Sequence, residues 1–295
     1  MSMQQLARIL EIGAENPPPT NATPDMMRAW LDEVTSYLPV AENVKIKRVK
    51  CGPCEGDLIL PKGGDDSRLI IFYHGGGFVF GSSRTHRVIA SNLARAAGSA
   101  TLVPDYRLAP ENPAPAAHND AFAVYKWALS QGYTPGSVAL SGDSGGGNLA
   151  LATAVHAKEA GLALPSSLTL ASPWLDFAKE GASHWKVPDD PVISTELLNL
   201  LTSCYLCVGD HKSPKVTPFY SDFTGLPPTL VHVGSWERLH DDSITVVARM
   251  KAVGVAAELK IFDGMFHGWQ LYAPMLDDGM ASIEEFAAFI RAHQV

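Results

Sequence analysis

The stretch Val138-Ala139-Leu140-Ser141-Gly142-Asp143-Ser144-Gly145-Gly146-Gly147-Asn148-Leu149-Ala150 decides how this chain is organised. It begins as a short apolar run typical of a strand, passes through a glycine-dense corner and continues into an Ala-rich run that favours a helix. The corner contains Gly142-x-Ser144-x-Gly146, which fits the strand–turn–helix pattern called a nucleophile elbow. Glycines suit the positions two residues either side of the serine because larger side chains would collide on so sharp a turn. The pattern predicts that Ser144 is presented at the N-terminus of a helix, whose N–H groups and positive dipole end point at the site.

The same glycines also fit a dinucleotide-binding turn. Gly145-x-Gly147-x-x-Ala150 has the spacing of that fingerprint, which places a pyrophosphate at a helix N-terminus. The motif also needs an acidic residue about 20 residues further on. No acidic residue ends a strand at that distance, and Asp176 lies beyond a Ser-Pro-Trp corner. The missing residue disfavours a dinucleotide, and we expect no cofactor.

Hydrophobic periodicity predicts strands and helices that alternate along most of the chain. The expected strands cover residues 44–50, 57–60, 68–74, 100–104, 137–140, 167–171, 229–234 and 257–262. The expected helices cover residues 1–16, 24–38, 84–97, 118–130, 145–160, 195–207, 243–253 and 283–293, the second with Thr23 as its N-cap. Three strands followed by repeated helix–strand units predict an α/β fold with a mostly parallel eight-stranded sheet and helices on both faces.

Composition narrows the class of partner. Of the 295 residues, 46% are hydrophobic, which is enough for a large core, and the formal net charge is −8. No long basic run is present, so neither nucleic acid nor an anionic membrane surface is expected as a partner. No segment approaches the about 18 apolar residues of a spanning helix, and residues 1–16 lack the features of a signal peptide. We expect a cytoplasmic protein that acts on a small molecule; a homodimer is left open.

Four cysteines form two closely spaced pairs, Cys51-Gly-Pro-Cys54 and Cys204-Tyr-Leu-Cys207. The first copies a redox tetrapeptide, but that chemistry needs the first cysteine at a helix N-terminus, and this pair lies between two expected strands. Gly52-Pro53 is therefore predicted to be a hairpin turn. The two pairs are too far apart in sequence for a compact zinc site. Four ordinary reduced thiols and no metal are expected.

Two further segments supply the parts that acyl transfer needs beside a serine. His74-Gly75-Gly76-Gly77-Phe78 directly follows an expected strand, and consecutive glycines let backbone N–H groups turn toward a substrate oxyanion. His267 lies in the loop after the last expected strand, the position that a mobile general base requires. Other histidines fall within expected strands or helices, as His232 and His156 do.

The sequence identifies the acid that orients the histidine less clearly than it identifies the serine and the histidine. Sites of this topology run in the order serine, acid, histidine, and Glu237 follows an expected strand between Ser144 and His267. Asp241 and Asp242 compete for the role, although both precede an expected helix and suit its N-cap and first turn. We favour Glu237 because a carboxylate at a strand end can hold the second imidazole nitrogen.

At the level of motifs, the chain resembles the hormone-sensitive-lipase-like, bacterial family IV branch of α/β-hydrolase esterases. The matching segments are His74-Gly-Gly-Gly-Phe, Asp105-Tyr-Arg-Leu-Ala-Pro-Glu111, Gly142-Asp-Ser-Gly-Gly, Asp190-Pro-Val-Ile-Ser, Leu226-Pro-Pro-Thr-Leu and Gly264-Met-Phe-His-Gly-Trp, within about residues 44–295. The resemblance implies Ser144 as nucleophile, His267 as base, and oxyanion donors from Gly76, Gly77 and Gly145. The family usually has an Asp-Pro-Leu acid motif where this chain reads Glu237-Arg-Leu.

The resemblance also implies a helical cap over the core. The expected division is N-terminal cap helices at 1–40, a hydrolase core at 41–176, a cap insertion at 177–222 and the rest of the core at 223–295. Asp143 and Glu111 are expected to be structural rather than catalytic. Candidates to line an acyl pocket, with core packing as the alternative, are Phe78, Trp30, Trp185 and Phe219.

These residues predict a serine carboxylesterase that hydrolyses short- to medium-chain esters through an acyl-enzyme and needs neither cofactor nor metal. Two alternatives stay open. One is an amidase or deacetylase that uses the same triad, and the other is a non-catalytic binder of a small ligand, because fold does not fix function.

Overall fold

A computed structural model describes residues 3–20, 22–187, 189–206 and 211–295. The described strands form one eight-stranded sheet in the order β1-β2-β4-β3-β5-β6-β7-β8, in which β2 is antiparallel to both neighbours and the other pairs are parallel. The predicted α/β fold is confirmed. The strands are β1 (Val44–Cys51), β2 (Cys54–Pro61), β3 (Asp65–Tyr73), β4 (Ser99–Asp105), β5 (Val138–Asp143), β6 (Leu168–Ala171), β7 (Thr229–Gly234) and β8 (Ala257–Phe262).

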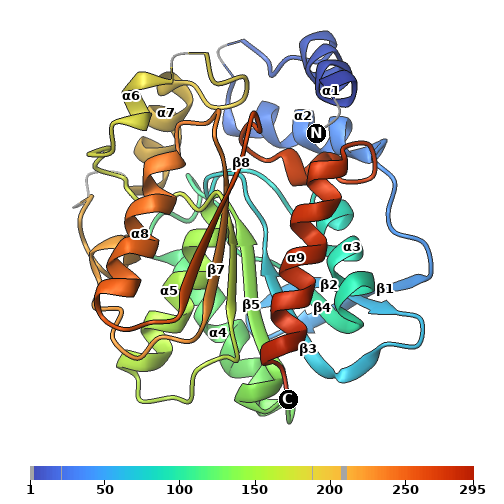
Figure 1. Ribbon diagram of the computed structural model, residues 1–295, viewed down its shortest axis with the longest axis vertical. Helices are drawn as coiled ribbons and strands as arrows, with labels where there is room; N and C mark the ends of the chain where they lie inside the picture. Colours follow the sequence, from blue (N-terminus) through green and yellow to red (C-terminus); the bar gives the residue numbers. More distant parts are fainter. Residues whose placement is uncertain (1–2, 21, 188, 207–210) are drawn as a thin grey trace.

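Helices cover both faces of this sheet (Figure 1). One apolar cluster packs α3 and α9 against one face, and a larger one packs α4, α5 and α8 against the other. The helices are α1 (Met3–Glu15), α2 (Pro24–Ser36), α3 (Arg87–Ala97), α4 (Ala116–Ser130), α5 (Gly145–Glu159), α6 (Ser183–Lys186), α7 (Thr195–Leu206), α8 (His240–Ala252) and α9 (Asp277–His293), with short 3₁₀ turns at Pro135–Ser137, Pro218–Tyr220 and Trp269–Tyr272. No helix in the described ranges is long and apolar enough to cross a membrane.

Two central strands bring the candidate motifs together. Strands β3 and β5 are buried over their last residues, and they pair in parallel with Tyr73 opposite Gly142. Parallel strands in register end at the same edge of a sheet. The loop that begins at His74 and the corner at Ser144 therefore leave the sheet side by side.

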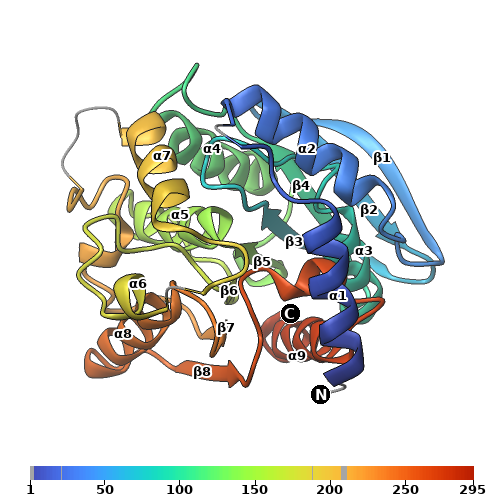
Figure 2. The same ribbon diagram turned by 90° about the horizontal axis from the view of Figure 1, so that it is seen from above.

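Four helices outside the sheet layers gather at one end of the molecule, as Figures 1 and 2 show for α1, α2, α6 and α7. Helix α2 begins as predicted, with Thr23 as its N-cap accepting from the N–H of Met26. Its Arg28 guanidinium donates to both oxygens of Glu111 and to the carbonyls of Val79 and Ala109. Glu111 thus attaches α2 to the core, which agrees with the structural role expected for it.

The cysteine hairpin forms as predicted. Cys51 pairs with Cys54 across a two-residue turn in which Gly52 has a positive φ of 65°. Both thiols are buried, and burial raises the pKa of each to about 12. Such thiols are poor nucleophiles at neutral pH. Of the second predicted pair, Cys204 lies in α7, whereas Cys207 lies outside the described residues.

The main differences from the predicted elements lie at helix starts. Helix α3 begins three residues later than expected, at Arg87, whereas α8 and α9 begin earlier, at His240 and Asp277. Acidic side chains occupy the first turns of α8 and α9, where they complement the helix dipole. The short α6 was not predicted, because four residues are too few for a hydrophobic period to register.

Candidate active site

Ser144 stands on a strained turn between β5 and α5. Its φ is 53° and its ψ is −121°, a backbone conformation that costs a non-glycine residue about 1–3 kcal/mol. The two flanking glycines of the motif are sterically required. A Cβ added to Gly142 would lie 2.4 Å from the carbonyl oxygen of Gly146, and one added to Gly146 would lie 1.9 Å from that of Tyr73. Close packing of neighbouring backbone groups therefore holds the turn at Ser144 in its strained conformation, as a strained functional turn requires.

His267 and Glu237 meet at the ends of two adjacent strands. Glu237 follows β7, His267 follows β8, and the imidazole Nδ1 lies 2.8 Å from Glu237 Oε2. The glutamate is fully buried, and its other oxygen, Oε1, accepts from Ser172 Oγ at 2.7 Å and from the N–H of Gly234 at 2.6 Å. An acceptor-only carboxylate makes Nδ1 the proton-bearing nitrogen. That assignment leaves Nε2 as the basic nitrogen.

The surroundings favour the protonated form of this histidine. Burial alone lowers the pKa of His267, but the hydrogen bond and the charge of Glu237, with the charges of Asp190 and Asp143, raise it above its ordinary value. Carboxylates thus stabilise the imidazolium that a general base becomes after it has taken a proton.

Asp241 and Asp242, the two alternatives to Glu237, contact other residues than His267. Asp241 Oδ2 accepts from the N–H of Ser183 at 2.9 Å, and Asp242 Oδ1 lies 2.8 Å from His184 Nε2. Both aspartates lie in the first turn of α8, but the N-cap is Leu239, and no side chain caps the helix. The expected first-turn position is confirmed for both, whereas the expected N-cap role is wrong, because their carboxylates bond to Ser183 and His184 instead. Of the three acids, Glu237 is the one that the structure brings to His267.

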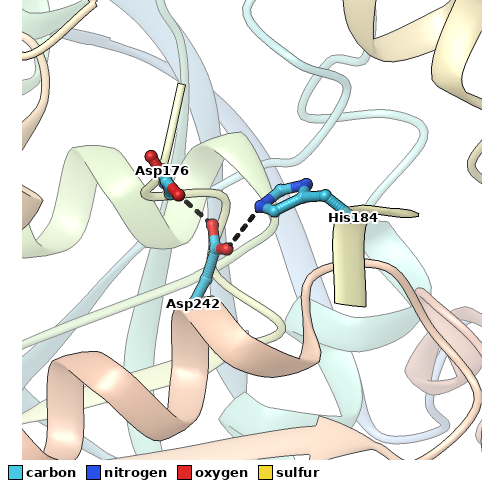
Figure 3. A group of neighbouring side chains, drawn as sticks. All are labelled: Asp176, His184 and Asp242. Atoms are coloured by element: carbon cyan, nitrogen blue, oxygen red, sulfur yellow. Dashed lines mark hydrogen bonds and ion pairs between the residues drawn. The ribbon is translucent and has the colours of Figure 1, made fainter. Parts of the chain in front are cut away.

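Asp242 also belongs to a buried group with Asp176 and His184, the one set of described side chains whose ligand-type atoms lie close enough to hold a metal ion (Figure 3). The two aspartates of this group have four carboxylate oxygens, and all four already accept hydrogen bonds. Asp242 Oδ2 accepts from the N–H groups of Leu175 and Asp176, both at 2.8 Å, while the Asp176 carboxylate accepts from three N–H groups at the start of the insertion. The group therefore holds the start of the insertion in place, rather than presenting unoccupied ligand atoms to a metal ion.

The glycine loop after β3 faces the helix N-terminus. Gly76 and Gly77 have positive φ values of 106° and 58°, and a Cβ added to Gly145 would lie 3.3 Å from the backbone nitrogen of Gly77. Among the hydrogen bonds of the described residues, none is donated by the N–H of Gly76 or Gly77. As the first residue of α5, Gly145 likewise has an N–H without a partner inside the helix. These three groups are the expected oxyanion donors.

The four pocket candidates lie in different surroundings. Phe78 is fully buried and stacks on Tyr205 at a centroid distance of 4.1 Å. Trp185 is 59% exposed. The indole of Trp30 donates to the carbonyl of Asn16, and the ring of Phe219 lies under the Arg249 guanidinium at 5.4 Å. Their part in a pocket stays a prediction.

Arg238 is a residue of this site that the sequence analysis did not identify. Its side chain is nearly buried, its backbone N–H donates to Asp190 Oδ2 at 2.9 Å, and its guanidinium donates to the carbonyls of Ile193 and His184. These bonds fasten the loop that carries Glu237 to the insertion. The sequence did offer one indication of this role. The arginine occupies the position at which the Asp-Pro-Leu motif of the family has a proline, and a proline has no N–H to donate.

Comparisons with known proteins agree with this architecture. A family model described as alpha/beta hydrolase fold matches residues 70–271. An acetyl-hydrolase of Streptomyces hygroscopicus is 39% identical over 244 residues, which cover 82% of this chain and 81% of the relative. An esterase of Acinetobacter venetianus is 34% identical over 287 residues, which cover 95% of this chain and 93% of the relative.

A crystal structure of an esterase from the bacterial hormone-sensitive lipase family matches with a TM-score of 0.96 and 36% identity, over 99% of each chain. The match thus extends over nearly the whole of both chains. The chain belongs to the bacterial hormone-sensitive lipase family of α/β-hydrolase-fold esterases.

Proposed function

We propose that this esterase hydrolyses carboxylic esters with short to medium acyl chains, through an acyl-enzyme formed on Ser144. The observation that carries the proposal is the His267–Glu237 pair at 2.8 Å, in the loops that follow β7 and β8. Both strands run parallel to β5 in the same sheet, and the strained turn of Ser144 follows β5. A serine needs such a base because its hydroxyl is not nucleophilic at neutral pH.

In the first half-reaction, Ser144 Oγ attacks the ester carbonyl carbon while Nε2 of His267 takes the hydroxyl proton. The carbonyl oxygen becomes an oxyanion that accepts from the N–H groups of Gly76, Gly77 and Gly145. Glu237 holds the proton on Nδ1 and stabilises the imidazolium. Nε2 then returns its proton to the leaving alkoxide, the C–O bond breaks, and the alcohol departs.

In the second half-reaction, Nε2 of His267 takes a proton from water, and the hydroxide attacks the acyl carbon of the Ser144 ester. A second oxyanion forms in the same place and collapses. The proton on Nε2 passes to Ser144 Oγ as the acyl C–O bond breaks, which releases the carboxylic acid. One donor in such an oxyanion hole typically contributes about 2.7–4 kcal/mol to the transition state.

The preference for short acyl chains rests on the small insertion and its closeness to the reacting centre. A Cβ added to Gly77 would lie 2.5 Å from a side-chain carbon of Leu201 in α7. Phe78 packs on Tyr205 from the same helix. A helix seated directly on the oxyanion loop limits the room for an acyl chain beside it.

Replacing the serine tests this proposal. Ser144→Ala should remain folded, and turnover of p-nitrophenyl butyrate should fall by about 10⁴-fold or more, because the oxyanion hole and substrate binding alone remain. Activity within tenfold of the parent would place the nucleophile elsewhere. Comparing p-nitrophenyl butyrate with the matching p-nitroanilide separates an esterase from an amidase on the same triad.

A further inference from the structure

A buried histidine–carboxylate pair lies against the oxyanion loop, and its only part in the steps above is the charge that Asp143 contributes to the surroundings of His267. His86 and Asp143 are 2% and 6% exposed, and His86 Nε2 lies 3.3 Å from Asp143 Oδ2. The N–H of Gly75, the first glycine of the loop, donates to Asp143 Oδ1 at 2.9 Å and lies 3.2 Å from His86 Nε2. The carboxylate of Asp143 is thus the acceptor of this backbone N–H, and the imidazole of His86 lies beside both groups.

The carboxylate packs so closely on the loop that position 75 excludes any side chain. A Cβ added to Gly75 would lie 2.2 Å from Asp143 Oδ2. Asp143 also directly precedes Ser144, the residue with the strained backbone. A single side chain therefore links the nucleophile turn to the loop that carries the oxyanion donors, and a displacement of either segment would move the other.

The far side of the imidazole is also anchored. His86 Nδ1 lies 2.8 Å from Thr85 Oγ1, while the Thr85 hydroxyl donates to the carbonyl of Ser82 at 2.9 Å. Because that hydroxyl proton is used, Nδ1 must be the donor to Thr85. The imidazole ring is thereby fixed at Nδ1, and Nε2 is directed at Asp143 and Gly75.

The remaining ionisable neighbours leave the charge of Asp143 in place. Burial by itself raises the pKa of Asp143, but the charge and hydrogen bond of His86, with the charge of His267, lower it overall. The His74 ring lies 5.5 Å from the His86 ring, and burial lowers the pKa of His74 to about 4, so His74 is neutral near pH 7. Tyr106 donates to the carbonyl of His74. Asp143 therefore remains a carboxylate acceptor for Gly75.

We propose that His86 and Asp143 are positioning residues that orient Gly75, and through it aim the N–H groups of Gly76 and Gly77 at the substrate oxyanion. The inference rests on the proposed function of Ser144. Both donor glycines follow Gly75 with positive φ values, so the direction of their N–H groups depends on how the chain enters the loop. Neither positioning residue touches the substrate or the reacting atoms in this scheme.

This role predicts a loss confined to the transition state. The oxyanion exists there and not in the bound ester, so misdirected donors lower kcat and leave KM nearly unchanged. Removing one oxyanion donor elsewhere costs about 10²–10³-fold in kcat. We expect His86→Ala to lower kcat on p-nitrophenyl butyrate by about 10²-fold with KM within about threefold of the parent.

Affinity for a trifluoromethyl ketone, whose tetrahedral adduct carries the same oxyanion, should fall in parallel with kcat. His86→Gln, which keeps an N–H toward Asp143, should recover most of the rate. A general loss of packing would not be restored by this change alone.

The matched control is His232→Gln, which alters another fully buried histidine, one whose Nδ1 contacts Ser282 in a different part of the fold. It should lower the melting temperature without lowering kcat. Labelling of the parent by paraoxon at Ser144 separates the two hypotheses: an unlabelled parent refutes the proposed function, whereas a labelled parent beside an unimpaired His86→Ala refutes the positioning role.

An effect confined to KM, or an equal kcat loss in His232→Gln, would also overturn the proposal. If His86→Ala does not fold, His86→Leu decides the matter. That variant fills most of the space of the ring but removes both nitrogens, and it should lower kcat by about 10²-fold. An unchanged kcat would refute the positioning role.

Discussion

Replacing Glu237 by glutamine changes one atom at the acid position, and the structure fixes where that atom must go. Glu237 Oε1 accepts from Ser172 Oγ and from the backbone N–H of Gly234, and a backbone N–H cannot become an acceptor. The glutamine oxygen must therefore take the Oε1 position. Its NH₂ group then faces Nδ1 of His267, 2.8 Å away in the parent.

An NH₂ donor at that position selects the wrong tautomer of His267. Nδ1 would have to accept, so the proton would move to Nε2, which could no longer take a proton from Ser144. An acid-to-amide change with this consequence lowers kcat by about 10⁴-fold in a serine hydrolase, or about 5.4 kcal/mol of transition-state stabilisation. The loss should fall on kcat with little change in KM, because the lost interaction belongs to the transition state.

Steady-state kinetics with p-nitrophenyl butyrate, alongside thermal unfolding, measure this effect. The control is Asp241→Asn, whose side chain can still accept from the N–H of Ser183. It should lower stability by about 1 kcal/mol or less and leave kcat near normal. A Glu237→Gln enzyme within tenfold of the parent, together with an Asp241→Asn enzyme that loses the rate, would refute the assignment of the acid.

Three further predictions follow from the same geometry. His267 must be unprotonated to act as base, and its pKa is raised above 6.5, so kcat/KM should fall as pH drops through a midpoint above 6.5; a midpoint below 6 would contradict the role of its carboxylates. Turnover of p-nitrophenyl esters should favour acyl chains up to about eight carbons, and faster hydrolysis of sixteen-carbon than of four-carbon esters would contradict the small cap. Chelators should change neither activity nor melting temperature, because the carboxylates of Asp176 and Asp242 already accept N–H donors; stoichiometric zinc in protein purified without added metal would overturn this.

The parts of the site that local sequence determines could be predicted. The glycines around Ser144 were informative because a strained turn excludes side chains, and the structure shows both clashes that they avoid. Glu237 could be favoured from chain order and its place after a strand, because parallel strands bring their ends to one edge.

The parts of the site that depend on contacts between segments distant in the sequence could not be predicted. The bonds of Arg238 to the insertion, and those of Asp241 and Asp242, join residues that no periodicity relates. A first-turn aspartate looks the same in sequence whether it caps its own helix or binds another segment. Likewise His86 had no local motif, and its position against the oxyanion loop follows from how the segment before α3 packs.

Covalent labelling tests most directly whether Ser144 is the nucleophile. The parent enzyme and Ser144→Ala are each incubated with paraoxon, and intact mass and peptide mapping then locate any diethylphosphoryl group. The proposed triad predicts one group per chain, on Ser144, with activity lost in proportion to labelling, and none on the variant. A parent that loses activity while Ser144 stays unmodified, or a variant that labels as fast as the parent, would contradict it.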